Sequence, residues 1–151
     1  MNKIVEFLND TKIFYLSTID GDKPRVRPFG AVMEKEGKIY FCTNNQKDVY
    51  RQMQKNPNIE ISATKENGDW LRLSGQAVFD TSKDIKQAML DECPVLKTMY
   101  SADDGKFEIF YITNTSATVF SLCGKKKLSK SKLTSTAFSE YNQTAFLHSQ
   151  S

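Results

Sequence analysis

The chain has 151 residues, of which 26% are charged, and a formal net charge of +3. This length allows one domain with a core of its own, without the disulfides or metals that much smaller chains need. The three cysteines are widely spaced, which excludes a paired-cysteine zinc or redox motif and favours a reducing compartment. No stretch approaches the roughly 18 apolar residues of a membrane span and no signal peptide is recognisable, so we expect a cytoplasmic protein.

The charge is unevenly distributed along the chain. Residues 124–151 hold five lysines and one glutamate, whereas residues 1–123 hold 16 basic and 17 acidic side chains. The segment 124–151 is also rich in Ser and Thr, and we expect it to be a disordered or loosely attached tail behind a folded domain at 1–123. A basic tail can bind nucleic acid or an anionic membrane, although most such clusters are only solvated chain ends.

The first half of the chain predicts a helix, three strands and a second helix. The expected helix is 4–10, and the expected strands are 12–19, 24–34 and 38–43, with turns at 20–22 and 35–37. The last two strands then form a hairpin. A helix from Asn45 to about Lys55 follows, for which Asn44 and Asn45 are suitable caps and Asn56-Pro57 is the stop signal.

The second half predicts four more strands and two short helices. The expected strands are 59–63, 70–79, 107–113 and 117–123, the last two joined by a turn at 114–116, and the helices are 82–92 and 94–100, divided by Pro94. About seven short strands with few helices predict a mainly β protein, an antiparallel closed or split β-barrel with peripheral short helices. The strands 12–19 and 38–43 are apolar on both faces, so we expect a homodimer to cover them.

The segment PRVRPFG (24–30) carries two arginines two residues apart on a strand. If Glu34 lies opposite Lys38 in the hairpin, Arg27 lies opposite Asn45 and Arg25 opposite Lys47. Both arginines would then lie at the start of the following helix, where unpaired N–H groups and the helix dipole favour an anion such as a phosphate. In the alternative interpretation the arginines cover a solvated strand face and are balanced by nearby carboxylates.

The run FYLSTIDGDKPRVRPFGAVMEKEGKIYFCTNNQKDVYRQMQKNPNIEIS (14–62), with WLRLSGQAVF (70–79) after it, resembles the FMN-binding split barrel of the pyridoxamine 5′-phosphate oxidase-like family. The resemblance implies a homodimer with FMN at the subunit interface. It implies Arg27 and Lys47 as phosphate ligands and Arg25 as a weaker candidate. The residues it implies along the flavin and its ribityl chain are Val26, Pro28, Phe29, Thr43 and Asn44, with Trp70 and Leu71 reaching the cofactor, often from the partner subunit.

Departures from the family pattern narrow the expected function. The segment GKKKLSKSKL does not match the arginine-rich end of the oxidase proper, so oxidation of pyridoxamine phosphate is not expected. The chain also resembles the nitroimidazole-resistance reductase branch, in which a histidine follows an IYF-like strand. Cys42 stands at that place here, and the only histidine is His148 in the expected tail. Free cysteines mostly behave as small hydrophobic residues, and a lone tryptophan such as Trp70 most often fills a core.

The sequence therefore predicts an FMN-dependent oxidoreductase in which the flavin carries the chemistry and no side chain is needed as a general base. The electron donor would be a nicotinamide and the acceptor a nitro compound, a quinone or another small electrophile. One alternative is a flavin-binding or flavin-storage module without turnover. Another is a small barrel that binds nucleic acid through its basic tail. No motif for a metal, a P-loop or a dinucleotide fold is present.

Overall fold

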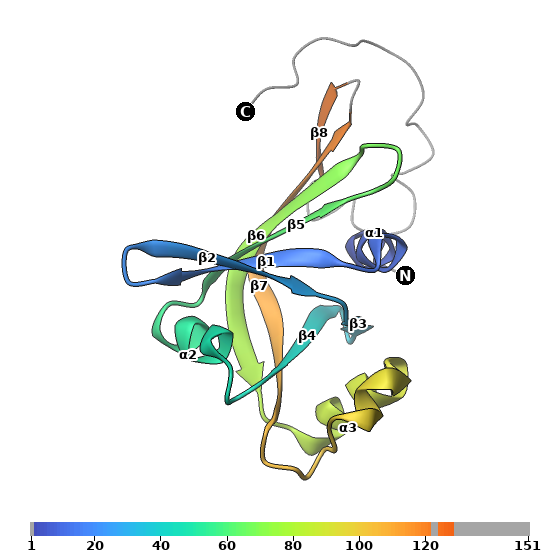
Figure 1. Ribbon diagram of the computed structural model, residues 1–151. Helices are drawn as coiled ribbons and strands as arrows, with labels where there is room; N and C mark the ends of the chain where they lie inside the picture. The colour runs from blue at the N-terminus through green and yellow to red at the C-terminus, as the bar shows by residue number, and fades with distance from the viewer. Residues whose placement is uncertain (1, 122–123, 129–151) are drawn as a thin grey trace.

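The computed structural model describes residues 2–121 and 124–128, which form one β-sheet with helices around it (Figure 1). In chain order the elements are α1 (Lys3–Thr11), β1 (Phe14–Asp20), β2 (Lys23–Phe29), β3 (Val32–Lys35), β4 (Lys38–Asn44), α2 (Asp48–Lys55), β5 (Asn58–Thr64), β6 (Trp70–Asp80), α3 (Lys83–Glu92), the 3₁₀ helix η1 (Pro94–Thr98), β7 (Phe107–Ser121) and β8 (Gly124–Leu128).

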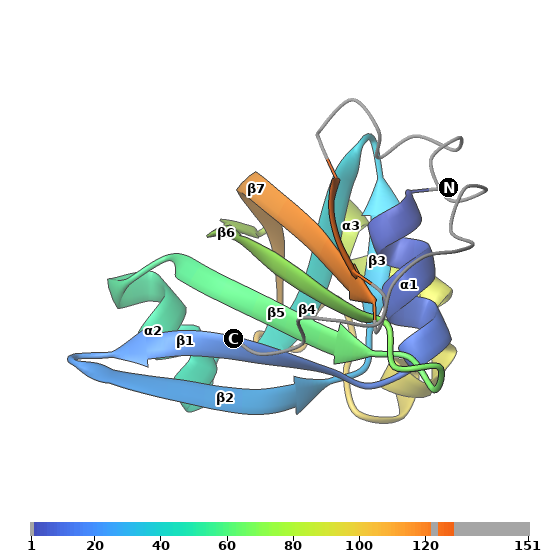
Figure 2. The same cartoon turned by 90° about the horizontal axis from the view of Figure 1, so that it is seen from above.

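The sheet has the strand order β2-β1-β5-β6-β7-β4-β3, and β8 pairs with β7. All of these pairs are antiparallel. The strands fan apart when the molecule is seen from above, and helix α1 lies near β3 at one side of the fan (Figure 2). The expected fold class, an antiparallel split barrel with peripheral helices, is confirmed.

Apolar side chains form two clusters on the two faces of β4. The larger cluster joins α1 and α2 to the sheet and includes Phe14, Leu16 and Phe41. The smaller cluster joins α3 and η1 to β3, β4 and β7 and includes Tyr40. Both faces of β4 are therefore covered within the chain, and the expectation that this strand needs a second subunit for its cover is wrong. The α3–η1 unit does the covering, because its apolar side chains pack against the face that the sequence left without a partner.

The outer face of the β1–β2 hairpin, in contrast, is not covered by any of the described residues. Tyr15 is 52% exposed, Ile19 37% and Val26 67%. Alternation along β1 places Phe14, Leu16 and Thr18 toward the interior, so Tyr15 and Ile19 point outward. We call the outward side chains Ile13, Tyr15, Ile19 and Val26 the hairpin face.

The hairpin predicted for residues 24–43 is wrong in its pairing. Strand β2 pairs with β1, so that Arg27 lies opposite Leu16 and Arg25 opposite Thr18. Gly21, with a φ of 66°, closes a tight turn after β1, and the chain returns along β1 before it reaches β3. The expected strand 24–34 is two strands, interrupted at Gly30 and Ala31.

The turn predicted at 35–37 is present between β3 and β4, but Lys35 rather than Glu34 lies opposite Lys38. Glu36 and Gly37 have φ values of 50° and 73°, as a two-residue hairpin turn requires, which shifts the register by one residue. Helix α2 starts at Asp48, and its N-cap is Lys47, whose side chain makes no cap bond. Of the predicted caps, Asn44 is the last residue of β4 and Asn45 lies in the turn before the helix.

Residues 107–121 form one long strand, β7, and not the predicted hairpin with a turn at 114–116. Strands β6 and β7 share an irregularity between Ser74 and Gln76, and Asn114 has a φ of 51°. A Cβ at Gly75 would lie 2.6 Å from the Thr113 carbonyl oxygen, so the two strands bend together where β6 has no side chain. The first five residues of the expected tail form β8 along β7, and residues 129–151 lie outside the described part of the chain.

Candidate functional site

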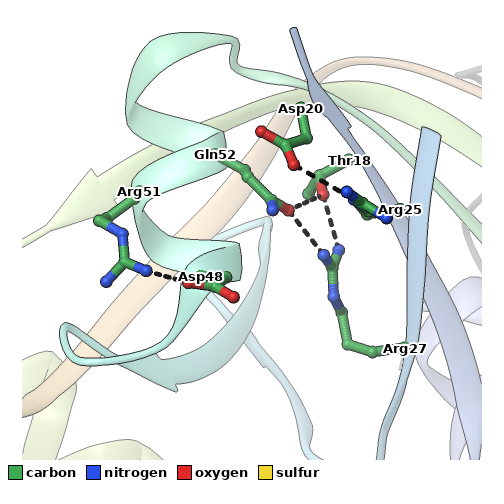
Figure 3. A network of polar contacts seen from close by, with 7 residues as sticks. All are labelled: Thr18, Asp20, Arg25, Arg27, Asp48, Arg51 and Gln52. Carbon is green, nitrogen blue, oxygen red and sulfur yellow. Dashed lines mark hydrogen bonds and ion pairs between the residues drawn. The ribbon is translucent and has the colours of Figure 1, made fainter. Parts of the chain in front are cut away.

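The β1–β2 hairpin lies along helix α2, with Arg25 and Arg27 on the side toward the helix (Figure 3). The buried Thr18 hydroxyl of β1 donates a hydrogen bond of 2.6 Å to the Gln52 side-chain oxygen of α2. This bond ties the hairpin to the helix. The two arginines thus come close to the start of α2, as the sequence predicted, but through β1 and not through pairing with β4.

Arg25 has a carboxylate partner. Its Nε lies 3.2 Å from Asp20 Oδ2, and both side chains are about half exposed, at 50% and 47%. A solvated ion pair of this kind contributes little free energy and leaves little net charge. Arg25 therefore fits the alternative interpretation from the sequence, in which nearby carboxylates balance the arginines.

Arg27 has no carboxylate partner among the described residues. Its guanidinium donates to Leu16 O, Thr18 Oγ1 and Gln52 Oε1, all of them uncharged. Burial and, to a smaller extent, the nearby Arg25 lower the pKa of Arg27. A guanidinium is never deprotonated at physiological pH, so the lowered pKa means that an uncompensated positive charge is held here.

Lys47 adds a second positive charge at the N-cap of α2. No ion pair of Lys47 occurs among the described residues, whereas the neighbouring Asp48 pairs with Arg51. A cavity of about 400 Å³ lies between the hairpin and α2, and Lys47, Arg25 and Arg27 all line it. Its remaining lining residues are Asp20, Val26, Asp48, Val49 and Gln52.

A second cavity, of about 560 Å³, adjoins the first, because Arg27, Lys47 and Val49 line both. Its other walls are mostly apolar and come from the end of β2, from β4 and from η1: Pro28, Phe29, Gly30, Ala31, Cys42, Thr43, Cys93, Pro94, Val95, Leu96, Met99 and Tyr100. Thr43 Oγ1 is buried without a hydrogen-bond partner in the described structure. A buried hydroxyl without a partner is unfavourable, which indicates a ligand that completes it.

The structure brings together seven of the ten residues predicted for the site. Arg25, Val26, Arg27, Pro28, Phe29, Thr43 and Lys47 line one or both cavities, and of these the Val26 side chain belongs to the outer hairpin face. Asn44 lines neither cavity. Its side chain accepts a hydrogen bond from the Gln46 backbone N–H and donates one to the hydroxyl of Tyr100, a residue that lines the second cavity. Asn44 therefore helps to hold Tyr100 in place.

Trp70 and Leu71 lie at the start of β6, opposite Phe120 and Val119 near the end of β7, and they line neither cavity. Trp70 stacks on Phe120 with ring centroids 4.1 Å apart. The Leu71 side chain is fully buried in the larger core cluster. Within one chain neither side chain reaches the site, and the Leu71 side chain serves the core.

Cys42 lines the second cavity, but its side chain is a thiol and not a thiolate. Its pKa is raised to about 12, mainly by burial and further by the neighbouring Cys93, against a smaller opposing effect of Lys47. The thiol thus stays protonated at neutral pH, and a reactive cysteine needs the opposite shift. Histidines and carboxylates do not occur in the described lining of this cavity, so its walls hold no ordinary general base.

The sequence pattern did not predict Thr18, Gln52 or the η1 wall as parts of the site. Thr18 occupies the third inward position of β1, after Phe14 and Leu16, and is 1% exposed. Gln52 shares a helix face with the buried Val49 and Met53. A polar residue at a buried position of an apolar pattern is the signal that could have identified both.

The profile of the pyridoxamine 5′-phosphate oxidase family matches residues 1–119. A NimC/NimA family protein from Clostridium acetobutylicum is 44% identical, with a TM-score of 0.81 over 83% of this chain and 90% of that one. General stress protein 26 from Bacillus anthracis has a TM-score of 0.64 at 20% identity, over 78% of this chain and 89% of that one. Among curated proteins, none matches the chain.

A pyridoxamine 5′-phosphate oxidase-related, FMN-binding protein from Nostoc punctiforme shares the fold, with a TM-score of 0.61 at 12% identity over 84% of this chain and 95% of that one. The fold is thus the antiparallel split barrel of pyridoxamine 5′-phosphate oxidase-like proteins, as the sequence resemblance indicated. The chain belongs to the pyridoxamine 5′-phosphate oxidase-like, FMN-binding family. In the described residues no helix is long and apolar enough to cross a membrane.

Proposed function

We propose that this protein is an FMN-dependent oxidoreductase that acts as a homodimer. The observation that carries the proposal is the pair of cations, Arg27 and Lys47, that has no carboxylate partner in the described residues and lies where a polar cavity meets an apolar one. A phosphate monoester compensates such a pair, with the guanidinium as a planar fork and the ammonium as a point charge.

The second cavity suits the flavin ring and the ribityl chain of FMN. The cavity of about 560 Å³ lies within the usual range for small-molecule sites, about 300–1,000 Å³, and offers apolar walls to a flat ring system. Pro28 and Phe29 follow Arg27 along β2, and Leu96 and Tyr100 contribute further apolar surface to the lining. The orphaned Thr43 hydroxyl would donate to a ribityl or phosphate oxygen. The residues present therefore fit the cofactor.

When bound, FMN would supply the electron transfer between a nicotinamide donor and a small acceptor such as a nitro compound or a quinone. The chain itself would hold the phosphate, exclude water along the apolar walls and leave one side of the ring open to substrates. The absence of histidine and carboxylate from the described cavity lining supports a role of this kind, because no proton-transfer group is placed there.

The hairpin face supports the homodimer. It exposes apolar side chains on β1 and β2, immediately beside the strand that carries both arginines. Burying these side chains against a second copy would stabilise the dimer. The same contact would close the cavities with residues of the partner, and Trp70, which is only partly exposed here, is the candidate for such a contribution.

The first experiment is the absorbance spectrum of the purified protein, with mass-spectrometric identification of the released chromophore. We expect FMN in about one copy per chain, and nicotinamide oxidation that depends on an added nitroaromatic compound or quinone. A colourless protein that gains no bound FMN on reconstitution contradicts the proposal. A yellow protein without turnover for any donor and acceptor favours the storage module, which uses the same site.

A second experiment tests the dimer. Val26→Glu places a charge in the hairpin face, and we expect a monomer by light scattering together with weaker FMN binding. Asn67→Glu, in the exposed turn between β5 and β6, is the matched control and should remain dimeric. A monomeric Val26→Glu variant that binds FMN with unchanged affinity would exclude a cofactor site shared between subunits.

A further inference from the structure

The Arg27 guanidinium is fixed on one edge by neutral oxygen atoms. Nη1 donates to Thr18 Oγ1 at 2.7 Å and to the Leu16 carbonyl oxygen at 3.3 Å. Nη2 donates to Gln52 Oε1 at 2.7 Å. Thr18 Oγ1 and Gln52 Oε1 are themselves 2.6 Å apart, so the two acceptors sit side by side at the end of the guanidinium (Figure 3).

Two of the N–H groups of the Arg27 guanidinium have no hydrogen-bond partner in the described structure. Arginine has five N–H donors in fixed directions. Both hydrogens of Nη1 and one hydrogen of Nη2 are used by Leu16, Thr18 and Gln52. The Nε–H and the second Nη2–H remain, and they point in parallel from the same lateral edge of the group. Two parallel N–H donors match two oxygens of one phosphate group.

Gln52 is essential to this arrangement because its side-chain oxygen accepts hydrogen bonds from Arg27 and Thr18 and the side chain carries no charge. Arg27 can only donate, so the atom of Gln52 that it contacts is the oxygen. Thr18 donates its single hydrogen to the same oxygen and accepts a hydrogen bond from Nη1, so it has no further hydrogen to donate. A carboxylate at position 52 would hold the same edge but would neutralise the guanidinium, as Asp20 does for Arg25.

We propose that Gln52, with Thr18, is a positioning residue that presents the lateral edge of Arg27 to a phosphate monoester while preserving its charge. The inference rests on the proposed function, since it takes the phosphate to be that of FMN. It goes further by assigning the preference for FMN over riboflavin, which lacks only the phosphate, to a neutral hydrogen-bond acceptor on α2. Gln52 itself need not touch the ligand.

The test compares Gln52→Glu and Gln52→Met with the wild type by titration with FMN and with riboflavin. Gln52→Glu should weaken FMN binding about ten- to a hundredfold, the size of one or two charge-assisted hydrogen bonds, and leave riboflavin binding within about twofold. Gln52→Met keeps the volume and the neutral charge but removes the acceptor, and should weaken FMN binding about three- to tenfold. Should Gln52→Glu fail to fold, Gln52→Met carries the test.

Gln54→Glu is the matched control, because it adds the same charge to the same helix at an exposed residue whose side chain bonds the Tyr50 hydroxyl. It should bind FMN like the wild type. A loss as large as that of Gln52→Glu would attribute the effect to helix charge and overturn the proposal. If the Gln52 variants lose equal affinity for FMN and for riboflavin, Gln52 has a structural role only, and this result would overturn the proposal as well.

An NMR titration separates this inference from the proposed function. The side-chain Nε–H signal of Arg27, assigned by its absence in Arg27→Ala, should shift on addition of inorganic phosphate to the wild type and shift much less in Gln52→Glu. If the protein takes up no FMN but the phosphate shift is present and depends on Gln52, the proposed function fails and the role of Gln52 stands. If FMN binds and neither the phosphate shift nor the FMN affinity depends on Gln52, the role of Gln52 fails and the proposed function stands.

Discussion

Arg25 and Arg27 lie two residues apart on the same face of β2, yet their surroundings differ in charge. Near the tip of the hairpin, Arg25 pairs with Asp20 in a half-exposed ion pair. Closer to its base, Arg27 is held by two side-chain oxygens and a backbone carbonyl, all neutral. A strand position therefore does not decide whether an arginine keeps an uncompensated charge. The charge of the groups that hold it does.

The largest expected effect is that of Arg27→Ala. Loss of a bidentate, charge-assisted contact should weaken FMN binding about a hundredfold, or about 2.7 kcal/mol, by fluorescence titration. Arg25→Ala is the control and should weaken it no more than about threefold, since Asp20 already compensates that charge. Equal losses in the two variants would contradict the distinction drawn between the arginines.

Thr43→Val should have opposite effects on binding and on stability. The orphaned Oγ1 is unfavourable in the protein without cofactor, so its replacement by a methyl group should raise the free energy of unfolding by about 1 kcal/mol. The same change removes a donor to the ligand and should weaken FMN binding about fivefold. Thermal unfolding and FMN titration measure the two effects, and a destabilised variant would show that the hydroxyl already has a partner.

Asp20→Asn makes the surroundings of Arg25 resemble those of Arg27. It removes a carboxylate from the lining of the first cavity and frees the guanidinium of Arg25, so FMN should bind about threefold more tightly at low ionic strength. Asp22→Asn changes the same charge in the same turn without lining either cavity. Tighter binding in both variants would point to net charge and not to the ion pair.

The smallest effect is expected for Cys42→Ser, which should leave FMN binding within about twofold. Because the folded-state pKa of Cys42 is raised from 9.0 to about 12, the folded protein keeps a proton that the unfolded chain releases. The contribution of Cys42 to stability is therefore fully present below pH 9 and is lost as the pH rises toward about 12. Urea unfolding across this range should show a smaller loss of stability in Cys42→Ser than in the wild type.

Of the predicted tail, 124–151, the structure describes only residues 124–128. Residues 124–128 form a strand where the sequence composition indicated the start of a loose segment. Backbone pairing with β7 explains this, because the ladder needs only N–H and C=O groups and tolerates a run of lysines. The suggested role of the tail in binding nucleic acid stays a prediction, since residues 129–151 lie beyond the described part of the chain.

The order of most elements, the split-barrel class and the grouping of Arg27, Lys47 and Thr43 around one cavity agree with the predictions from the sequence, because apolar periodicity, turn residues and ordered motifs are local properties. The pairing of β2, the single strand β7 and the cover of β4 by η1 do not, because they depend on which distant segments meet. The difference between Arg25 and Arg27 belongs to the second group. Only the packing of α2 against β1 brings the neutral oxygen of Gln52 to one arginine, while the other reaches a carboxylate.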